Sequence, residues 1–131
     1  MKIAIVGASN RVKRKVQKMI ADMGIKCSRK PLHVRELSSS YYDCALLRSK
    51  SVFVNATIKK DIALGQLDHI KDKKIHVIYI WSSSKYRRGV MLNEQAKLNK
   101  DYIALSVSEL ELQSETAMGW SKIKTYVQKL Q

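Results

Sequence analysis

The sequence predicts a single three-layer α/β/α domain over residues 1–131, with a mostly parallel, five-stranded sheet at its centre. Three observations favour this fold class. The chain has 131 residues, a common length for one domain. Its apolar runs are about as long as a strand, and between them lie segments whose apolar residues recur at helical spacing. Strands that alternate with helices need crossover connections, and these connections join parallel strands.

The chain opens with the pattern of a strand, a turn and a helix. Lys2 to Ala8 is an almost continuous apolar run with β-branched members, typical of a central strand covered on both faces. Ser9 or Asn10 can cap the helix that follows. From Arg11 to Met23 the apolar residues recur at helical spacing and leave the basic residues largely on the other faces. Gly24 is a suitable residue to end this helix.

The next segment gives weaker signals. Ile25 to Val34 is predicted to be a short edge strand, because Pro31 interrupts it. Residues 35–50 are predicted to form a helix that is capped by one of the serines at positions 38–40. Ser51 to Thr57 has the composition of a strand.

The second half repeats the alternation of strand and helix. Lys59 to Asp72 is predicted to be helical, and Ile75 to Trp81 is the strongest strand signal in the chain. A helix is expected over residues 85–99, followed by a last strand from Tyr102 to Val107 and by Ser108 as a cap. The final helix presents one apolar face, made of Trp120, Ile123, Val127 and Leu130.

These elements favour a doubly wound, Rossmann-like sheet with the flavodoxin-like strand order 2-1-3-4-5. In such sheets, ligands bind at the carboxyl ends of the strands, where the order reverses beside the first strand. The loops predicted to form a site are therefore those at residues 7–11, 55–60 and 82–88.

Charge is the strongest compositional signal. The chain has 25 Lys and Arg against 11 Asp and Glu, a net charge of +14. Residues 1–60 contain 14 of the basic residues and only three acidic ones. An excess of this kind is not required by any fold and indicates attraction to a polyanion. The alternative is a solvated basic face that keeps the protein in solution.

The first strand-to-helix turn is the sharpest candidate site. Positive side chains near a helix N-terminus are locally unfavourable, by about 0.3–1 kcal/mol each, and a bound phosphate would reverse that cost. The segment GASNRVKR has neither the dinucleotide fingerprint nor the Gly-Lys-Ser/Thr end of a Walker loop, so a purely structural turn is the alternative. The predicted phosphate or nucleotide site consists of Gly7, Ser9, Asn10 and Arg11. The predicted nucleic-acid contacts on this helix are Lys13, Arg14 and Lys15.

A second basic group follows the strongest strand. Lys85, Arg87 and Arg88 lie near Tyr86 and Trp81, and single-stranded nucleic acid is bound by such combinations of cations and aromatic rings. Tyr41 and Tyr42 could extend that surface. Alternatively, each of these aromatic rings packs into the core.

The segment GVMLNEQAKLNKDYIAL gives a partial family resemblance. Together with the preceding strand it covers residues 75–105, which resemble nucleoside deoxyribosyltransferases and related Rossmann-like domains. The resemblance implies that Glu94 is a catalytic nucleophile that attacks the sugar carbon and releases or transfers the base. The alternative is an ordinary solvated glutamate on a helix.

The sequence therefore predicts a cytoplasmic protein that binds nucleic acid or a nucleotide, with an N-glycosidic-bond enzyme or an adaptor for an acidic protein as alternatives. No membrane partner, cofactor or metal is expected, and an exposed sheet edge could support a homodimer. His33, His69 and His76 are scattered and have no ligand spacing. Cys27 and Cys44 are 17 positions apart and are expected to be reduced, structural residues.

Overall fold

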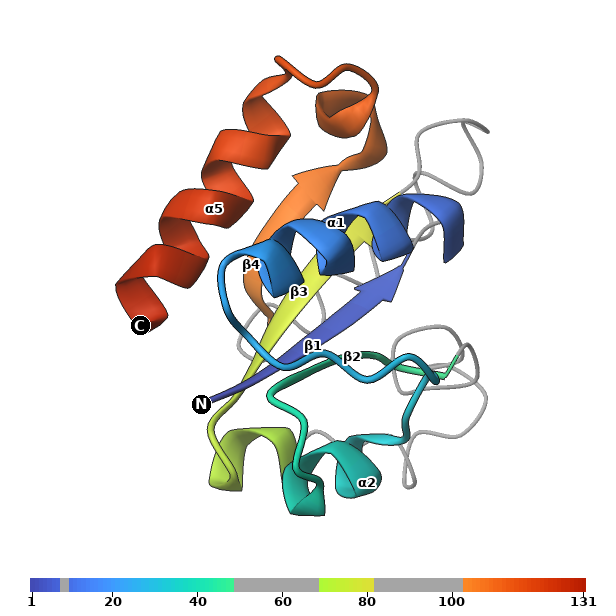
Figure 1. Cartoon of the computed structure of the whole chain (residues 1–131), viewed down its shortest axis with the longest axis vertical. Coiled ribbons are helices and arrows are strands. Elements are labelled where there is room, and N and C mark those ends of the chain that lie inside the picture. Colours follow the sequence, from blue (N-terminus) through green and yellow to red (C-terminus); the bar gives the residue numbers. More distant parts are fainter. Residues whose placement is uncertain (8–9, 49–68, 82–102) are drawn as a thin grey trace.

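Four parallel strands form the sheet of the described part of the chain (Figure 1). The strands are β1 (Lys2–Gly7), β2 (Cys44–Leu46), β3 (Ile75–Trp81) and β4 (Ile103–Ser108), and their order is β2-β1-β3-β4. This computed structural model describes residues 1–7, 10–48, 69–81 and 103–131. The mixed α/β class and the parallel sheet confirm the coarse prediction, whereas four strands rather than five are present in these ranges.

The register of the sheet aligns the carboxyl ends of its two central strands. β1 and β3 pair along their whole shared length, from Lys2 opposite Ile75 to Gly7 opposite Ile80. Because the strands are parallel, the end of β1 lies at the same edge of the sheet as the end of β3. The end of β1 at Gly7 therefore lies at the carboxyl edge of the sheet, where ligands of open α/β sheets bind.

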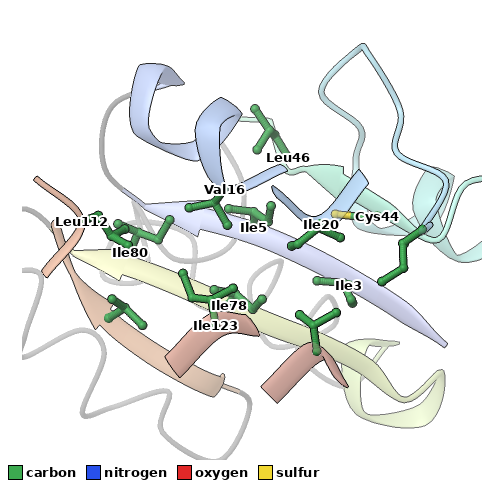
Figure 2. Packing of buried hydrophobic residues seen from close by; sticks show 13 residues of the cluster. Ile3, Ile5, Val16, Ile20, Cys44, Leu46, Ile78, Ile80, Leu112 and Ile123 are labelled. Atoms are coloured by element: carbon green, nitrogen blue, oxygen red, sulfur yellow. The ribbon is translucent and has the colours of Figure 1, made fainter. Parts of the chain in front are cut away.

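One face of the sheet is covered by α1 (Asn10–Asp22), α5 (Met118–Leu130) and the short 3-10 helix η1 (Glu109–Leu112) (Figure 1). Figure 2 shows how side chains of β1, β2 and β3 meet those of these helices in one apolar layer. The buried members of this layer are Ile3, Ile5, Val16, Ile20, Ile25, Cys44, Leu46, Ile78, Ile80, Val107, Leu112, Ile123 and Val127.

The opposite face is covered by α2 (Val34–Ser39) and by a helical turn at residues 69–72. Leu37 of α2 and Ile70 of this turn pack against the second apolar layer, which includes Ala4 and Val77. Helices on both faces explain why the central strands are apolar on both sides. This arrangement confirms the three-layer prediction for the described residues.

The first and last helices agree with their predicted patterns. In α1, Val16 and Ile20 are fully buried, and Gly24 follows the helix with φ of 91°, the left-handed conformation that favours glycine. In α5, Ile123 and Val127 are fully buried. Apolar periodicity is thus a sufficient signal where one helix face meets a sheet.

The cap predicted at Ser108 is also confirmed. Its hydroxyl accepts a hydrogen bond from the amide of Leu110, and Glu111 accepts one in return from the amide of Ser108. This reciprocal pair is a capping box at the start of η1.

The predictions for residues 25–50 are wrong in two places. Residues 25–34 do not form a strand; they make only isolated bridges between Cys27 and Cys44 and between Leu32 and Leu47. The predicted helix over residues 35–50 is only the six-residue α2, which His33 caps, and β2 follows where the helix was expected.

Packing on both faces explains why residues 44–47 are extended. Cys44 and Leu46 belong to the apolar layer under α1, whereas Ala45 and Leu47 belong to the layer over α2. Only an extended chain places successive side chains on opposite faces, so two apolar layers select a strand here.

The predicted strand order is corrected at the centre of the sheet. β3 pairs directly with β1, in the place where the flavodoxin-like order put the strand predicted at residues 51–57. That strand lies outside the described residues, as do the predicted helix at 85–99 and most of the one at 59–72. Within the described ranges, no helix is long and apolar enough to cross a membrane.

Candidate phosphate-binding site

The candidate site is the junction between β1 and α1. β1 ends at Gly7, α1 begins at Asn10, and the side chain of Asn10 is exposed. The first amides of a helix have no partner within it and carry a partial positive charge. α1 has no acidic residue in its first turn to balance that charge. Ser9, the predicted cap or ligand contact, lies outside the described residues.

Gly7 has a structural role that does not depend on a ligand. Its φ is 110°, a backbone conformation that residues with a side chain rarely adopt. A Cβ at this position would overlap the backbone carbonyl of Ile80 in the neighbouring strand. The close pairing of β1 with β3 therefore already requires glycine here, so Gly7 alone does not indicate a phosphate.

Lys13 is the unusual residue of the junction. Its side chain is only 3% exposed, whereas the side chains of Arg14 and Lys15 are exposed. The prediction that the basic residues of α1 lie away from the buried face is therefore wrong for Lys13. The physical reason is helical geometry: Lys13 precedes Val16 by three positions and Ile20 by seven, so all three share one side of the helix.

In the described part of the chain, the charge of the buried Lys13 amine is not balanced by any partner. Neither a hydrogen-bond acceptor nor a carboxylate among the described residues contacts it. Desolvation by burial lowers the pKa of Lys13. Because Cα–Cβ bonds in a helix tilt toward its N-terminus, a side chain on the fourth residue of α1 is directed toward the first turn. A positive group is thus buried next to the positive end of the helix dipole.

The other basic residues of α1 form a separate, exposed surface. Arg11, Arg14, Lys15 and Lys18 occupy positions i, i+3, i+4 and i+7, and all four side chains are exposed. We call these four residues the cationic stripe. No carboxylate of the described residues pairs with them, since the ion pairs found there are Lys2–Asp43, Arg48–Glu36 and Lys122–Glu111.

The structure therefore divides the predicted basic cluster into two parts. Lys13 belongs to the buried side of α1, and Arg11, Arg14 and Lys15 belong to its outer side. Lys18 joins the outer group although it is absent from the predicted contacts. The signal that could have found it is its spacing of three, four and seven positions from the other members.

The second predicted basic group cannot be placed. Lys85, Arg87 and Arg88 lie outside the described residues, and so does Glu94, the predicted nucleophile. These assignments stay predictions. Trp81 ends β3, and its backbone pairs with Ser108 of β4.

The two adjacent tyrosines lie at the other end of the sheet. Tyr41 and Tyr42 precede β2, whose first residue pairs with Ile3 near the start of β1. The Tyr41 side chain is 73% exposed, and the Lys26 amine lies 3.8 Å from the centroid of its ring. This is a cation–π contact at the amino edge of the sheet. The two tyrosines therefore do not extend a site at the carboxyl edge.

No catalytic arrangement of side chains is present in the described ranges. The Ser38 hydroxyl lies 2.8 Å from Nε2 of His69, but it also donates to the carbonyl of Arg35. The hydroxyl proton is thus used, and the histidine nitrogen must donate rather than act as a base. Within these ranges, no group of three His, Cys, Asp or Glu side chains could hold a metal ion.

Comparisons with known proteins bear on the fold. No protein-family model and no curated protein matches the chain. Two solved structures of de novo designed proteins are similar to it. One, described as a PLOOP2X3_50 fold protein, has a TM-score of 0.55 and 12% identity over 98% of this chain and 93% of its own. The other, described as having a P-loop NTPase fold, has a TM-score of 0.52 and 11% identity over 98% of this chain and 92% of its own. At these identities the likeness concerns the fold alone, so this chain has a mixed α/β fold similar to that of P-loop NTPases.

Proposed function

We propose that this protein binds a phosphate-bearing ligand at the amino end of α1, and that this ligand is a nucleic acid. The observation that carries the proposal is the buried Lys13 amine, which has no partner among the described residues. An uncompensated buried charge is costly for a folded protein. An anion bound at this site would balance the charge of Lys13 and so offset that cost.

The chemistry of the junction suits a phosphate. The backbone N–H groups at the start of α1 lie at the helix end, where phosphate oxygens can accept hydrogen bonds, and the helix dipole favours a negative charge there. Lys13 adds a full positive charge directed toward the same turn. Burial strengthens the attraction, because the local dielectric constant is lower than that of water.

The sequence spacing supports the same role for Lys13. This residue follows Gly7 by six positions, the separation of the first glycine and the lysine in the phosphate-binding loop G-x-x-x-x-G-K-[ST]. Two positions depart from that motif, since Val12 replaces the second glycine and Arg14 replaces the hydroxyl residue that binds magnesium. The residues present therefore do not fit a magnesium-dependent nucleotide hydrolase, and the proposal is limited to binding.

The cationic stripe favours a polymer over a free nucleotide. Arg11 and Lys18 are seven residues apart, which is roughly 10 Å along a helix. A single terminal phosphate cannot reach both ends of that stripe, whereas successive phosphates of a polynucleotide can. Contacts of this kind are electrostatic and do not read the base sequence.

Binding to a labelled single-stranded oligonucleotide over a range of salt concentrations tests the proposal. We expect affinity to fall steeply with salt, because each phosphate contact releases counterions. The double variant Arg14→Glu/Lys18→Glu should weaken binding and flatten the salt dependence. A matched control is Lys71→Glu/Lys73→Glu, which makes the same charge change on exposed residues next to Ile70, on the opposite face of the sheet.

Three outcomes would contradict the proposal or part of it. Equal losses in the two double variants would mean that only net charge matters and that α1 is no site. Binding of a mononucleotide with the affinity of the oligonucleotide would overturn the role of the cationic stripe. Binding that is absent at every salt concentration would remove the nucleic-acid proposal and leave an acidic protein as the partner to test.

A further inference from the structure

Cys27 and Cys44 are brought face to face by the fold, although they are 17 positions apart in the sequence. They form an isolated parallel bridge at the start of β2. The amide of Cys44 donates to the carbonyl of Lys26 over 3.1 Å, and the amide of Ser28 donates to the carbonyl of Cys44 over 2.9 Å. These two hydrogen bonds fix Cys27 directly opposite Cys44.

This geometry places the two thiols within reach of each other. Bridged strands lie about 4.8 Å apart, which is inside the range of roughly 4.4–6.8 Å between Cα atoms of a disulfide. Opposed residues point to the same face, and both cysteines pack on the apolar layer beneath α1 (Figure 2 shows Cys44 in that layer). The Cys27 thiol also lies 3.7 Å from the carbonyl oxygen of Gln17 and 3.5 Å from that of Ile25. Both thiols are free in this structure.

The environments of the two thiols differ. Cys27 is partly exposed, whereas Cys44 is fully buried. Interaction with the neighbouring Cys44 thiol lowers the pKa of Cys27, whereas interaction with Cys27 together with burial raises the pKa of Cys44. Nucleophilic attack by cysteine requires the thiolate, so Cys27 is the more reactive and the more accessible of the two.

We propose that Cys27 and Cys44 are a redox-active pair that closes to an intramolecular disulfide when the protein meets a hydroperoxide. The Cys27 thiolate attacks one peroxide oxygen, the O–O bond breaks, and hydroxide leaves, taking up a proton to become water. Cys27 is then a sulfenic acid. The Cys44 sulfur, after losing its proton, attacks the Cys27 sulfur, the S–O bond breaks, and a second water forms. Two thiols are oxidised, and one hydrogen peroxide is reduced to two waters.

The proposal is independent of phosphate binding. The disulfide would join β2 to the segment that follows α1, at the end of α1 distant from Asn10. Its formation is measured as a change in thiols and mass, so its failure would leave the proposed phosphate site untouched.

Thiol trapping on the native chain tests the proposal, because the protein contains only these two cysteines. The folded protein is treated with hydrogen peroxide, unfolded in the presence of N-ethylmaleimide, and weighed by mass spectrometry. We expect a monomer that has lost two hydrogen atoms and takes up no label, and that takes up two labels after reduction. Two labels without reduction, a disulfide between two chains, or oxygen added to both sulfurs would each overturn the proposal.

The variant Cys44→Ser separates the two roles. It removes the resolving thiol, so Cys27 should stop at the sulfenic acid and react with dimedone. The matched variant Cys27→Ser leaves only the buried thiol, which should stay reduced under the same treatment. Equal reactivity of the two single variants would overturn the assignment of roles. If either variant fails to fold, the result on the native chain decides the proposal alone.

Discussion

At Lys13, the packing of α1 and the charge of the side chain act in opposite directions. Its place on the helix buries the side chain, while desolvation disfavours the ammonium form and lowers the pKa. A binding residue can retain this conflict if the ligand resolves it. The conflict leads to a prediction in which stability and binding change in opposite senses.

The variant Lys13→Met keeps most of the length of the side chain and removes its charge. We expect the ligand-free variant to be more stable than the native protein, by about 1–3 kcal/mol, because a buried charge with no partner among the described residues is removed. Phosphate-bearing ligands should then raise its Tm less than they raise that of the native protein. Thermal unfolding with and without an oligonucleotide measures both effects.

Lys15→Met is the matched control on the same helix. Lys15 is exposed, so the same substitution should leave the stability of the free protein within about 0.5 kcal/mol of the native value. A loss of stability in Lys13→Met would show that the Lys13 amine is compensated in the free protein. The inferred role of Lys13 would then be wrong.

The burial of Lys13 could have been predicted from the helical periodicity of α1. Val16 and Ile20 mark the buried side of α1, and Lys13 falls on that side when it is counted by three and seven positions. A prediction that treats the basic residues 11–15 as one cluster does not separate the buried Lys13 from its exposed neighbours. The structural reason for Gly7, by contrast, is not visible in the sequence, because it depends on the pairing of β1 with β3.

Among the elements, η1 offers a direct test of local structure. The Ser108 hydroxyl accepts a hydrogen bond of 3.2 Å from the amide of Leu110, and this contact starts the 3-10 helix that precedes α5. Ser108→Ala should lower the free energy of unfolding by about 1 kcal/mol, since the amide loses its partner. Urea unfolding measures the change.

Ser114→Ala is the comparison for this cap. The Ser114 side chain is exposed and makes a weak contact of 3.4 Å with Thr116, so little stability should be lost. An equal effect of the two substitutions would mean that the capping box contributes nothing specific to the fold.

The elements also show which sequence signals suffice. α1 and α5 each bury one face, and their apolar spacing predicted them closely. β2 was missed because it is only three residues long, and an apolar run this short cannot be told from part of a helix by its pattern. The sequence patterns could not reveal the bridges of Cys27 and Leu32, since both depend on where β2 lies.

For the whole molecule, we predict how the stability of the fold depends on pH. His76 of β3 contacts α5, with Nδ1 lying 2.9 Å from the hydroxyl of Tyr126. Burial, and then the positive N-terminus, lower the pKa of His76 below its usual 6.5. The unfolded chain therefore binds a proton at a higher pH than the folded one. Stability should be full above about pH 7 and should fall as the pH decreases through and below 6.5.

Urea unfolding at about pH 7.5 and about pH 5.5 measures this loss. His76→Gln removes the titrating group and should make the dependence on pH shallower over this range. Some slope should remain, because desolvation also lowers the pKa of His69. A slope unchanged by His76→Gln would show that the burial of His76 does not couple folding to protonation.

At this scale, the sequence predicts the class of fold better than its topology. Alternating strands and helices indicated a parallel sheet covered on both faces, and the described residues agree. The pairing of β1 with β3 could not be predicted, because more than half of the chain lies between the two strands in the sequence. Local patterns do not encode such long-range pairing.

The most direct test of the account is the signal of the Lys13 amine itself. In protein carrying isotope-labelled lysine, NMR can follow the Cε and Nζ resonances of each lysine while an oligonucleotide is added. The account predicts that Lys13 titrates with a pKa below the ordinary value for lysine in the free protein, and that ligand raises this pKa and shifts the resonances strongly. Shifts confined to the exposed lysines, with Lys13 unchanged at saturation, would contradict it.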